Sequence, residues 1–153
     1  MSDDHEEIRA LVHAYAERID RGDFDAVADL FAHATLVAGD GSEFSGLDTL
    51  RQLWRSSVVT YDDGLPHVCH LISNLDVALG ADGTSATSRS YVTVMQAVAG
   101  ELALQPVAVS LHLDTFAKVD GAWRFTERRD RQVLVGDLSH HVHGVAPPGA
   151  AEA

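Results

Sequence analysis

The sequence has little cysteine, little positive charge and no long apolar run. Its 153 residues include one cysteine, Cys69, which excludes an internal disulfide and a metal site built from several cysteines. Lys and Arg number 11 against 23 Asp and Glu, so the formal net charge is −12. A surface with this charge repels polyanions, which argues against nucleic acid and anionic membranes as partners.

No segment is suited to cross a bilayer, because the longest stretch without Asp, Glu, Lys or Arg, 138–151, contains two prolines and three histidines. The N-terminus is acidic, the opposite of a secretory signal, so the sequence predicts a cytoplasmic protein. We find no phosphate-binding glycine loop after a strand and no serine nucleophile elbow. The composition, 46% hydrophobic and 22% charged, is typical of one globular domain.

The order of apolar patterns along the chain predicts an α+β fold. Helical spacing is found over 4–20, 24–31 and 47–58, with a short strand at 34–38. Four long β segments follow, at 67–79, 85–98, 102–118 and 122–135. We therefore expect N-terminal helices packed on a curved antiparallel or mixed sheet, forming a cone-shaped barrel with a pocket. The predicted domain is 1–135, with 136–153 as a C-terminal tail.

Three motifs resemble SnoaL-like and ketosteroid-isomerase-like proteins of the nuclear-transport-factor-2-like superfamily. They are the segment 15–25 with Leu30-Phe31-Ala32, the His-x-x-x-Asn of 70–74, and the hairpin motif from Asp114 through Asp120-Gly121 to Arg128. The match spans roughly 7–129. The resemblance implies a cone-shaped α+β barrel, commonly dimeric, in a superfamily of isomerases, dehydratases, cyclases, epoxide hydrolases and non-enzymes.

Within that superfamily, the pattern of candidate site residues is similar to that of scytalone-dehydratase-like and bile-acid-dehydratase-like enzymes. These enzymes place a tyrosine on the first helix, an aspartate about one turn later and a histidine on a strand around the pocket. The resemblance therefore implies that Tyr15, Asp20 and His70 are catalytic. Ketosteroid isomerases instead have a carboxylate base just after the first strand. Here that stretch reads Val-Ala-Gly at 37–39, and Asp40 is displaced by two residues.

Each of these three residues also has a structural interpretation. Tyr15 lies in the apolar stripe, so its buried hydroxyl meets either a substrate oxygen or a backbone carbonyl. Asp20 lies about 140° around the helix from Tyr15, where it is either a partner for His70 or a solvated carboxylate beside Arg21. His70 has a side chain suited to proton transfer near neutral pH, or it is a structural histidine.

Four further residues are candidates for substrate binding. Asn74 is expected on the same strand face as His70, because side chains alternate along a strand. His112 is expected on one strand face with Asp114, although Asp114 is better explained by an ion pair with Arg128. The remaining two candidates are apolar pocket walls or, alternatively, core residues: Trp54 and Phe31.

No cofactor or metal site is predicted. The histidines at 140, 141 and 143 lack an acidic or cysteine partner at ligand spacing, so we expect only adventitious metal binding there. Cys69 lies on the strand face opposite to His70 and is expected to have a buried, apolar role.

The leading functional hypothesis is a cofactor-independent lyase or isomerase, that is, a dehydratase, double-bond isomerase or cyclase. It would act by general acid–base proton transfer on a hydrophobic, oxygenated small molecule such as a polyketide- or steroid-like compound. His70 would remove the proton, Asp20 would orient His70, and Tyr15 would hydrogen-bond the developing oxyanion. The alternatives are a non-catalytic binding or assembly module, or the small subunit of a ring-hydroxylating oxygenase.

Two β segments are apolar on both faces, which predicts a homodimer through the open face of the sheet. One face of 102–118 carries the apolar residues Val107, Val109, Leu111 and Leu113. An exposed apolar patch of that size usually marks an interface, and two-fold pairing is the commonest way to cover it. The alternative is that the chain after residue 136 folds over this face and leaves a monomer.

Overall fold

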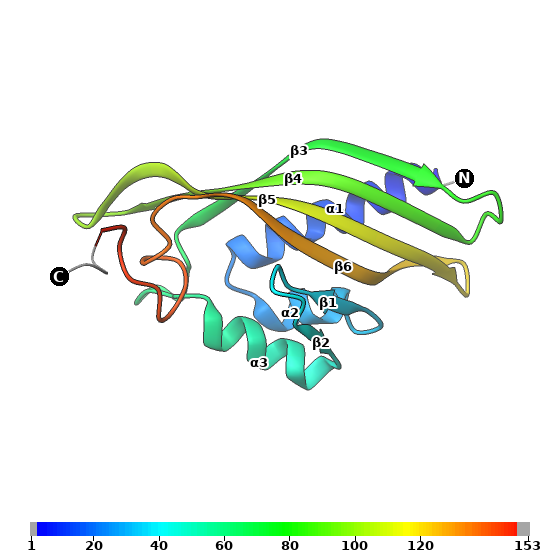
Figure 1. The fold of residues 1–153 in the computed structure, drawn as a ribbon. Coiled ribbons are helices and arrows are strands. Elements are labelled where there is room, and N and C mark those ends of the chain that lie inside the picture. The colour runs from blue at the N-terminus through cyan, green and yellow to red at the C-terminus, as the bar shows by residue number, and fades with distance from the viewer. Residues whose placement is uncertain (1–2, 150–153) are drawn as a thin grey trace.

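The computed structural model describes residues 3–149, which fold as three helices against a six-stranded sheet (Figure 1). The elements are α1 (Asp4–Asp20), α2 (Phe24–Leu30), β1 (Thr35–Val37), β2 (Glu43–Ser45), α3 (Leu47–Ser57), β3 (Val68–Leu79), β4 (Ser85–Val98), β5 (Leu102–Val119) and β6 (Ala122–Val135). The strand order is β2-β1-β6-β5-β4-β3, with only the β1–β6 pair parallel. The predicted α+β class is confirmed, with an open, curled, mixed sheet.

The first helix is capped at its N-terminus and buries one stripe. The Asp3 side chain accepts a hydrogen bond from the His5 backbone N–H at 3.0 Å, and acidic residues fill the first turn, which favours the positive end of the helix dipole. Its buried residues are Ile8, Val12, Tyr15, Ala16 and Ile19. This stripe faces the sheet, and α1 packs closely against β3 (Figure 1).

The turn after α1 requires glycine at position 22, because a side chain there would be strained. Gly22 has φ +71°, and a Cβ added there would lie 2.6 Å from the backbone oxygen of Gly64. Asp23 then caps α2 by accepting a hydrogen bond from the Ala26 N–H at 3.1 Å. The close approach of Gly22 to Gly64 holds the end of α1 against the loop that leads into β3.

Aromatic side chains dominate the core between the helices and the sheet. The Phe31 and Phe125 ring centroids are 4.5 Å apart, and those of Phe116 and Phe125 are 4.7 Å apart. Trp123 is also buried, and its indole N–H donates to the Asp4 carboxylate at 3.0 Å. Elsewhere, the inner face of the sheet carries buried polar side chains, which form the candidate site described below.

A bulge interrupts the side-chain alternation of β3. Ser73 pairs with Tyr91 on β4, but the next paired residue is Asp76, opposite Arg89. Asn74 takes a positive φ of 52° inside this bulge and is exposed. The expectation that Asn74 shares the face of His70 is therefore wrong, because the one extra residue on β3 shifts the alternation by one.

The chain after β6 does not extend as an unpacked tail. It turns away from the sheet at Gly136 and lies beside the C-terminal end of α3 (Figure 1). Val142 forms a β-bridge with Val58, and backbone hydrogen bonds of 2.9 Å join Val59 N to His141 O and His143 N to Ser57 O. The segment thus packs on the helical side rather than on the outer face of the sheet. Of the predicted tail, residues 150–153 lie outside the described residues.

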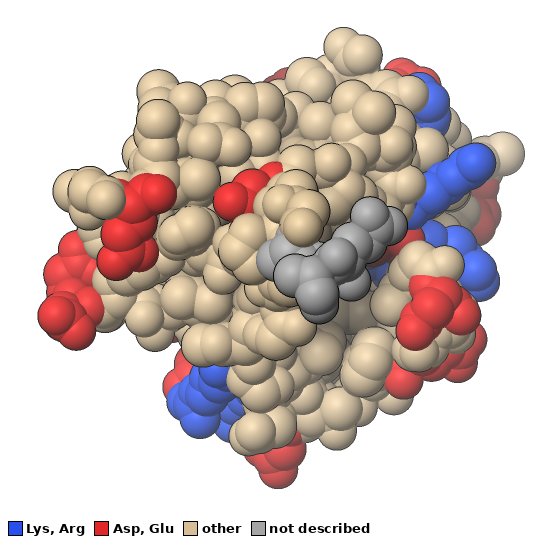
Figure 2. Space-filling model, turned by 60° about the vertical axis from the view of Figure 1, so that its left-hand side comes forward, with Lys and Arg blue, Asp and Glu red and all other residues tan. Residues whose placement is uncertain are grey.

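Acidic side chains outnumber basic ones over the surface. In Figure 2, much of one face is uncharged, and both acidic and basic groups lie at its margins. Within residues 3–149, none of the helices has the length and hydropathy needed to cross a membrane.

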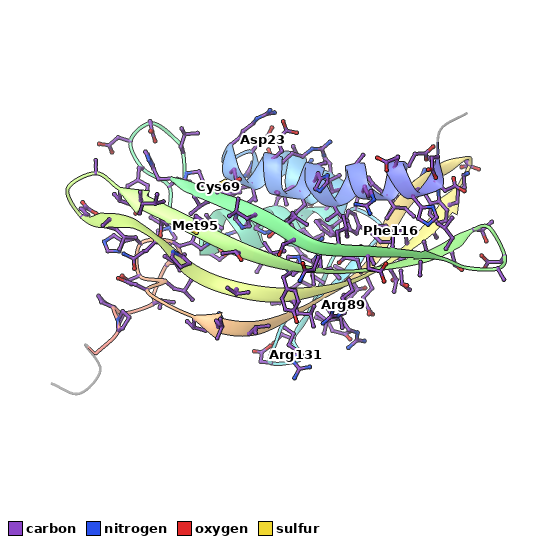
Figure 3. The ribbon with its side chains drawn as sticks, turned by 90° about the horizontal axis from the view of Figure 1, so that it is seen from above. Asp23, Cys69, Arg89, Met95, Phe116 and Arg131 are labelled. Carbon is purple, nitrogen blue, oxygen red and sulfur yellow. The ribbon has the colours of Figure 1, made fainter. Side chains whose placement is uncertain are left out.

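The outer face of the sheet is not covered by a helix and carries an apolar row (Figure 3). Strand register places Leu71, Thr93, Val109 and Leu134 side by side across β3, β4, β5 and β6. Leu71 is 48% exposed and Leu134 is 64% exposed. Cys69 is also exposed on this face, so the expectation that it is buried is wrong, because neither a helix nor the segment after β6 covers this side of β3. Val107, which the alternation places on this face, is fully buried beside a register shift in β5.

We propose that a second copy of the chain covers this apolar row. Light scattering at micromolar concentration is expected to give about twice the chain mass of 16.4 kDa. Leu134→Glu is expected to lower the mass to that of one chain, because it places a charge in the apolar row. Glu101→Gln, at an exposed hairpin position, is the control. A parent protein of 16.4 kDa would contradict the proposal.

Gly22→Ala is expected to lower the free energy of unfolding by more than about 1 kcal/mol, because it combines a positive φ with a backbone clash. Gly41→Ala is a matched control, since Gly41 has φ +86° and no atom within 4 Å of an added Cβ. Chemical denaturation of both variants isolates the clash. Equal losses in the two variants would show that the Gly22–Gly64 approach is not tightly packed.

Candidate active site

The end of α1 and the start of β3 meet through Asp20 and His70. The Asp20 carboxylate accepts the His70 backbone N–H at 3.0 and 3.2 Å and lies 2.6 Å from the imidazole Nδ1. The His70 side chain is 4% exposed and that of Asp20 is 23% exposed. A carboxylate is an acceptor only, so it holds the proton of neutral His70 on Nδ1 and leaves a lone pair on Nε2. Among the described residues, Nε2 has no hydrogen-bond partner.

Tyr15 packs against His70 from one turn further back on α1. Their ring centroids are 5.8 Å apart with nearly perpendicular planes. Burial raises the pKa of Tyr15 to about 12, against the opposing effect of the Arg128 guanidinium, 4.4 Å from the ring centroid. The hydroxyl is therefore protonated at neutral pH. It has no hydrogen-bond partner among residues 3–149, so it is a free donor.

Two cavities meet at these residues, and both are lined by Tyr15, His112 and Asp130. One, of about 160 Å³, also contains His70 and His141; the other, of about 210 Å³, extends toward Trp54 and Phe44 on the helical side. Their other walls are mainly apolar. Cavities of this size and lining suit a small, largely apolar molecule with a few polar groups.

His112 lies on β5, across the cavity from α1, with its ring centroid 5.8 Å from that of Tyr15. It is 4% exposed, and desolvation holds its pKa well below 6.5. Its Nε2 lies 3.9 Å from the Asp130 carboxylate, beyond hydrogen-bond distance. Asp130 is half-exposed, and partial desolvation raises its pKa.

His141 is a cavity residue that the sequence interpretation missed. The packed segment after β6 brings its ring centroid 6.1 Å from that of His70, and the residue is 7% exposed. Desolvation lowers its pKa to about 4, so the imidazole is neutral at physiological pH. His141 directly precedes Val142, which forms the bridge with Val58. A bridge between segments so far apart in sequence leaves no local pattern, so nothing in the sequence signals the position of His141.

A buried ion pair lies beneath the site. Arg128 donates from Nε and Nη2 to the two oxygens of Asp114 at 2.7 and 2.8 Å, and both residues are buried. This bidentate geometry confirms the pair predicted from the sequence. The guanidinium also lies over the rings of Tyr15, Phe31 and Phe125.

The structure brings together most, but not all, of the predicted site residues. Tyr15, His70 and His112 line one cavity, Asp20 lies behind His70, and Trp54 lines the second cavity. Phe31 is fully buried in the aromatic core and lines neither cavity, so its assignment to substrate binding is corrected to a core role. Asn74, in the β3 bulge, lines neither cavity.

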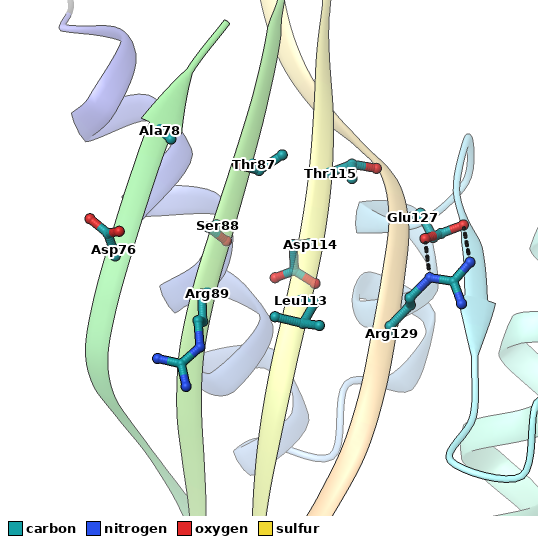
Figure 4. Close-up of a pocket in the computed structure, with 10 residues that line it drawn as sticks. All are labelled: Asp76, Ala78, Thr87, Ser88, Arg89, Leu113, Asp114, Thr115, Glu127 and Arg129. Carbon is teal, nitrogen blue, oxygen red and sulfur yellow. Dashed lines mark hydrogen bonds and ion pairs between the residues drawn. The ribbon is translucent and has the colours of Figure 1, made fainter.

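A separate hollow of about 340 Å³ lies on the outer face of the sheet (Figure 4). Its lining includes both acidic and basic side chains. Asp76 and Arg89 lie at one end, and a Glu127–Arg129 ion pair of 2.7 Å lies at the other. No histidine lines it, and proton-transfer groups gather on the opposite face. In the part of the chain that is described, no group of three or more His, Cys, Asp or Glu is arranged to hold a metal ion.

Comparison with known proteins agrees with this architecture. The family model of the SnoaL-like domain matches residues 1–129, so the chain belongs to the SnoaL-like domain family. No curated protein matches the chain.

Solved structures share the fold at low sequence identity. An NTF2-like protein with a cystatin-like fold from Novosphingobium aromaticivorans is 23% identical, with a TM-score of 0.71 over 85% of this chain and 82% of that one. A protein provisionally described as a scytalone dehydratase, from the same organism, is 22% identical, with a TM-score of 0.69 over 97% and 95%. ActVI-ORFA from Streptomyces coelicolor is 16% identical, with a TM-score of 0.68 over 84% and 96%.

The buried neutral state of His141 predicts a pH-dependent stability. Its pKa is about 4 in the fold and ordinarily 6.5, so between these values the unfolded chain binds more protons. The free energy of unfolding should therefore decrease as pH falls from 6.5 to 4, with this group contributing up to about 3 kcal/mol. Denaturation of His141→Asn at both pH values should show a smaller decrease. His143→Asn, at an exposed position of the same segment, should match the parent. Parallel pH profiles for all three proteins would contradict this assignment.

Proposed function

We propose that the protein is a cofactor-independent lyase or isomerase that acts by proton transfer on an oxygenated, hydrophobic small molecule. The observation that carries this proposal is the Asp20–His70 pair beside the free hydroxyl of Tyr15, at a cavity whose walls are partly polar and partly apolar. Membership of the SnoaL-like family and the fold shared with a protein provisionally described as a scytalone dehydratase support the same class of reaction.

The first step places His70 as general base. Its Nε2 lone pair takes a proton from a carbon next to a substrate carbonyl, and the electron pair of that C–H bond moves onto the carbonyl oxygen as an enolate. The Asp20 carboxylate stabilises the resulting imidazolium through the 2.6 Å contact to Nδ1. The Tyr15 hydroxyl donates a hydrogen bond to the enolate oxygen and stabilises its charge.

The second step returns the proton and decides the product. If the imidazolium protonates a different carbon, the double bond migrates. If it protonates a hydroxyl on the neighbouring carbon, that hydroxyl leaves as water as the enolate collapses into a conjugated double bond. If the enolate carbon attacks a second carbonyl of the same molecule, a ring closes, and the imidazolium protonates the new alkoxide. All three outcomes share the first proton transfer.

The test measures that shared first step. The protein is incubated in deuterated water with steroid, polyketide-like and cyclic hydroxy-ketone compounds, and carbon-bound deuterium or loss of water is followed by NMR. His70→Asn is expected to lower the rate by about 100-fold or more, because asparagine can still donate to Asp20 but has no basic nitrogen. Asp20→Asn is expected to lower it by at least about tenfold, since it removes the charge that stabilises the imidazolium.

His13→Asn, at an exposed position of α1, is the control and should keep the parent rate. An unchanged rate in folded His70→Asn would remove His70 from the mechanism. Compounds that bind without exchange or elimination in the parent protein would favour the alternative of a binding module.

A further inference from the structure

The segment after β6 forms one wall of the cavity and is held rigidly in that position. The His140 carbonyl accepts hydrogen bonds from the Gln96 side-chain amide and the Tyr61 hydroxyl, each at 2.8 Å. Gln96 is itself 1% exposed, so this anchor is part of the interior. Together with the β-bridge of Val142, these contacts fix the backbone on both sides of His141. The imidazole of His141 therefore has little freedom to leave the cavity.

His141 and His112 both line the cavity with ring nitrogens that the protein leaves unpaired. Both imidazoles are more than nine-tenths buried, and the Nδ1 atom of each is buried without a hydrogen-bond partner within the described residues. These Nδ1 atoms have almost no accessible surface, so a ligand in the cavity meets each side chain at Nε2, which accepts or donates no hydrogen bond within residues 3–149. Because unpaired buried polar groups cost about 1–3 kcal/mol each, a ligand that pairs with Nε2 offsets part of that cost. Desolvation lowers the pKa of both histidines, so each offers one N–H donor and one lone pair.

The charges near the cavity disfavour an anionic ligand. The Arg128 guanidinium donates from Nε and Nη2 to the Asp114 carboxylate, its Nη1 has no partner within residues 3–149, and the Asp20 and Asp130 carboxyls lie at the same site. Carboxyl groups thus outnumber the one guanidinium around the cavity. The chain also carries a net charge of −12, so an anion is repelled at long range as well.

We propose that His112 and His141 form a second polar subsite, which binds an uncharged oxygen-bearing group, a hydroxyl or a ketone, on the same molecule that presents its reacting carbonyl to His70 and Tyr15. This inference rests on the proposed function for the role of the second group, but the subsite itself is a matter of binding. It defines the ligand class: a compact, mainly apolar, uncharged molecule with at least two separate oxygen functions.

The test is a calorimetric titration at pH 7 with three aromatic probes of similar shape. The probes are para-hydroxyacetophenone, which has two uncharged oxygen functions; para-isopropylphenol, which has one; and para-hydroxybenzoate, which carries a charge. The parent protein is expected to bind the ketone most tightly. His141→Phe should weaken ketone binding by about fivefold, the effect of one lost hydrogen bond. It should change para-isopropylphenol binding much less, because that single hydroxyl can pair with Tyr15 or His70.

His143→Phe is the control for the same segment and should bind all three probes like the parent. His141→Gln, which keeps a donor and an acceptor, should restore part of the ketone affinity if His141→Phe has lost it. Circular dichroism verifies that each variant is folded. If His141→Phe does not fold, the comparison of parent and His141→Gln across the three probes takes its place, with a loss expected for the ketone alone.

Three results would overturn the subsite: equal losses for the ketone and para-isopropylphenol, para-hydroxybenzoate binding as tightly as the ketone, or no binding of the ketone at millimolar concentration. The titration reports binding and not turnover. If the binding results contradict the subsite, the proposed reaction at His70 is unaffected. If the parent protein binds the ketone selectively but shows no proton exchange, the subsite is supported and the proposed reaction is wrong.

Discussion

The contact between Asp20 and His70 holds the helical layer to the sheet at the place where the cavity opens. The Asp20 carboxylate, at the last residue of α1, accepts hydrogen bonds from both the backbone N–H and the ring Nδ1–H of His70 on β3. The backbone bond fixes the position of the helix relative to the strand, and the side-chain bond fixes the orientation of the imidazole. Structure and chemistry thus depend on the same two oxygens. The Gly22–Gly64 approach supports this contact, because it sets where α1 ends.

The interior contains charged and polar side chains as well as the apolar core. Arg128 and Asp114 neutralise each other, and removing either partner alone would leave a buried charge at a large cost in stability. The same guanidinium lies over the Tyr15 ring, so the ion pair also positions the phenol. Beside this bidentate pair lie two imidazoles with unpaired nitrogens, and Nη1 of Arg128 is also without a partner within residues 3–149. Unpaired polar atoms thus gather around the cavity, next to an ion pair that holds the phenol in place.

Much of this arrangement could be predicted from the sequence, because it depends on local patterns. The helical stripe of α1 places Tyr15 inside, and the bounds of β4 and β6 coincide with the predicted ones. Two features could not be predicted in this way. The β3 bulge that turns Asn74 outward depends on pairing with β4, and side-chain alternation assumes that no such interruption occurs. The second is the position of His141 in the cavity. It is set by hydrogen bonds that the backbone around it makes to α3 and to residues more than 40 positions away in sequence.

Burial at this site affects His70 in one way and His112 and His141 in another. The desolvation that lowers the pKa of His112 and His141 also strengthens the interaction of the Asp20 carboxylate with an imidazolium at His70. Moreover, it favours a protonated Tyr15, because an unpaired phenolate is costly to bury. Of the three cavity histidines, only His70 has a carboxylate within hydrogen-bond distance of its ring nitrogen, since His112 is 3.9 Å from Asp130 and the described residues offer His141 no such partner. The same burial therefore assigns different roles to three identical side chains: one is equipped to accept a proton and carry charge, and two are restricted to hydrogen bonding as neutral groups.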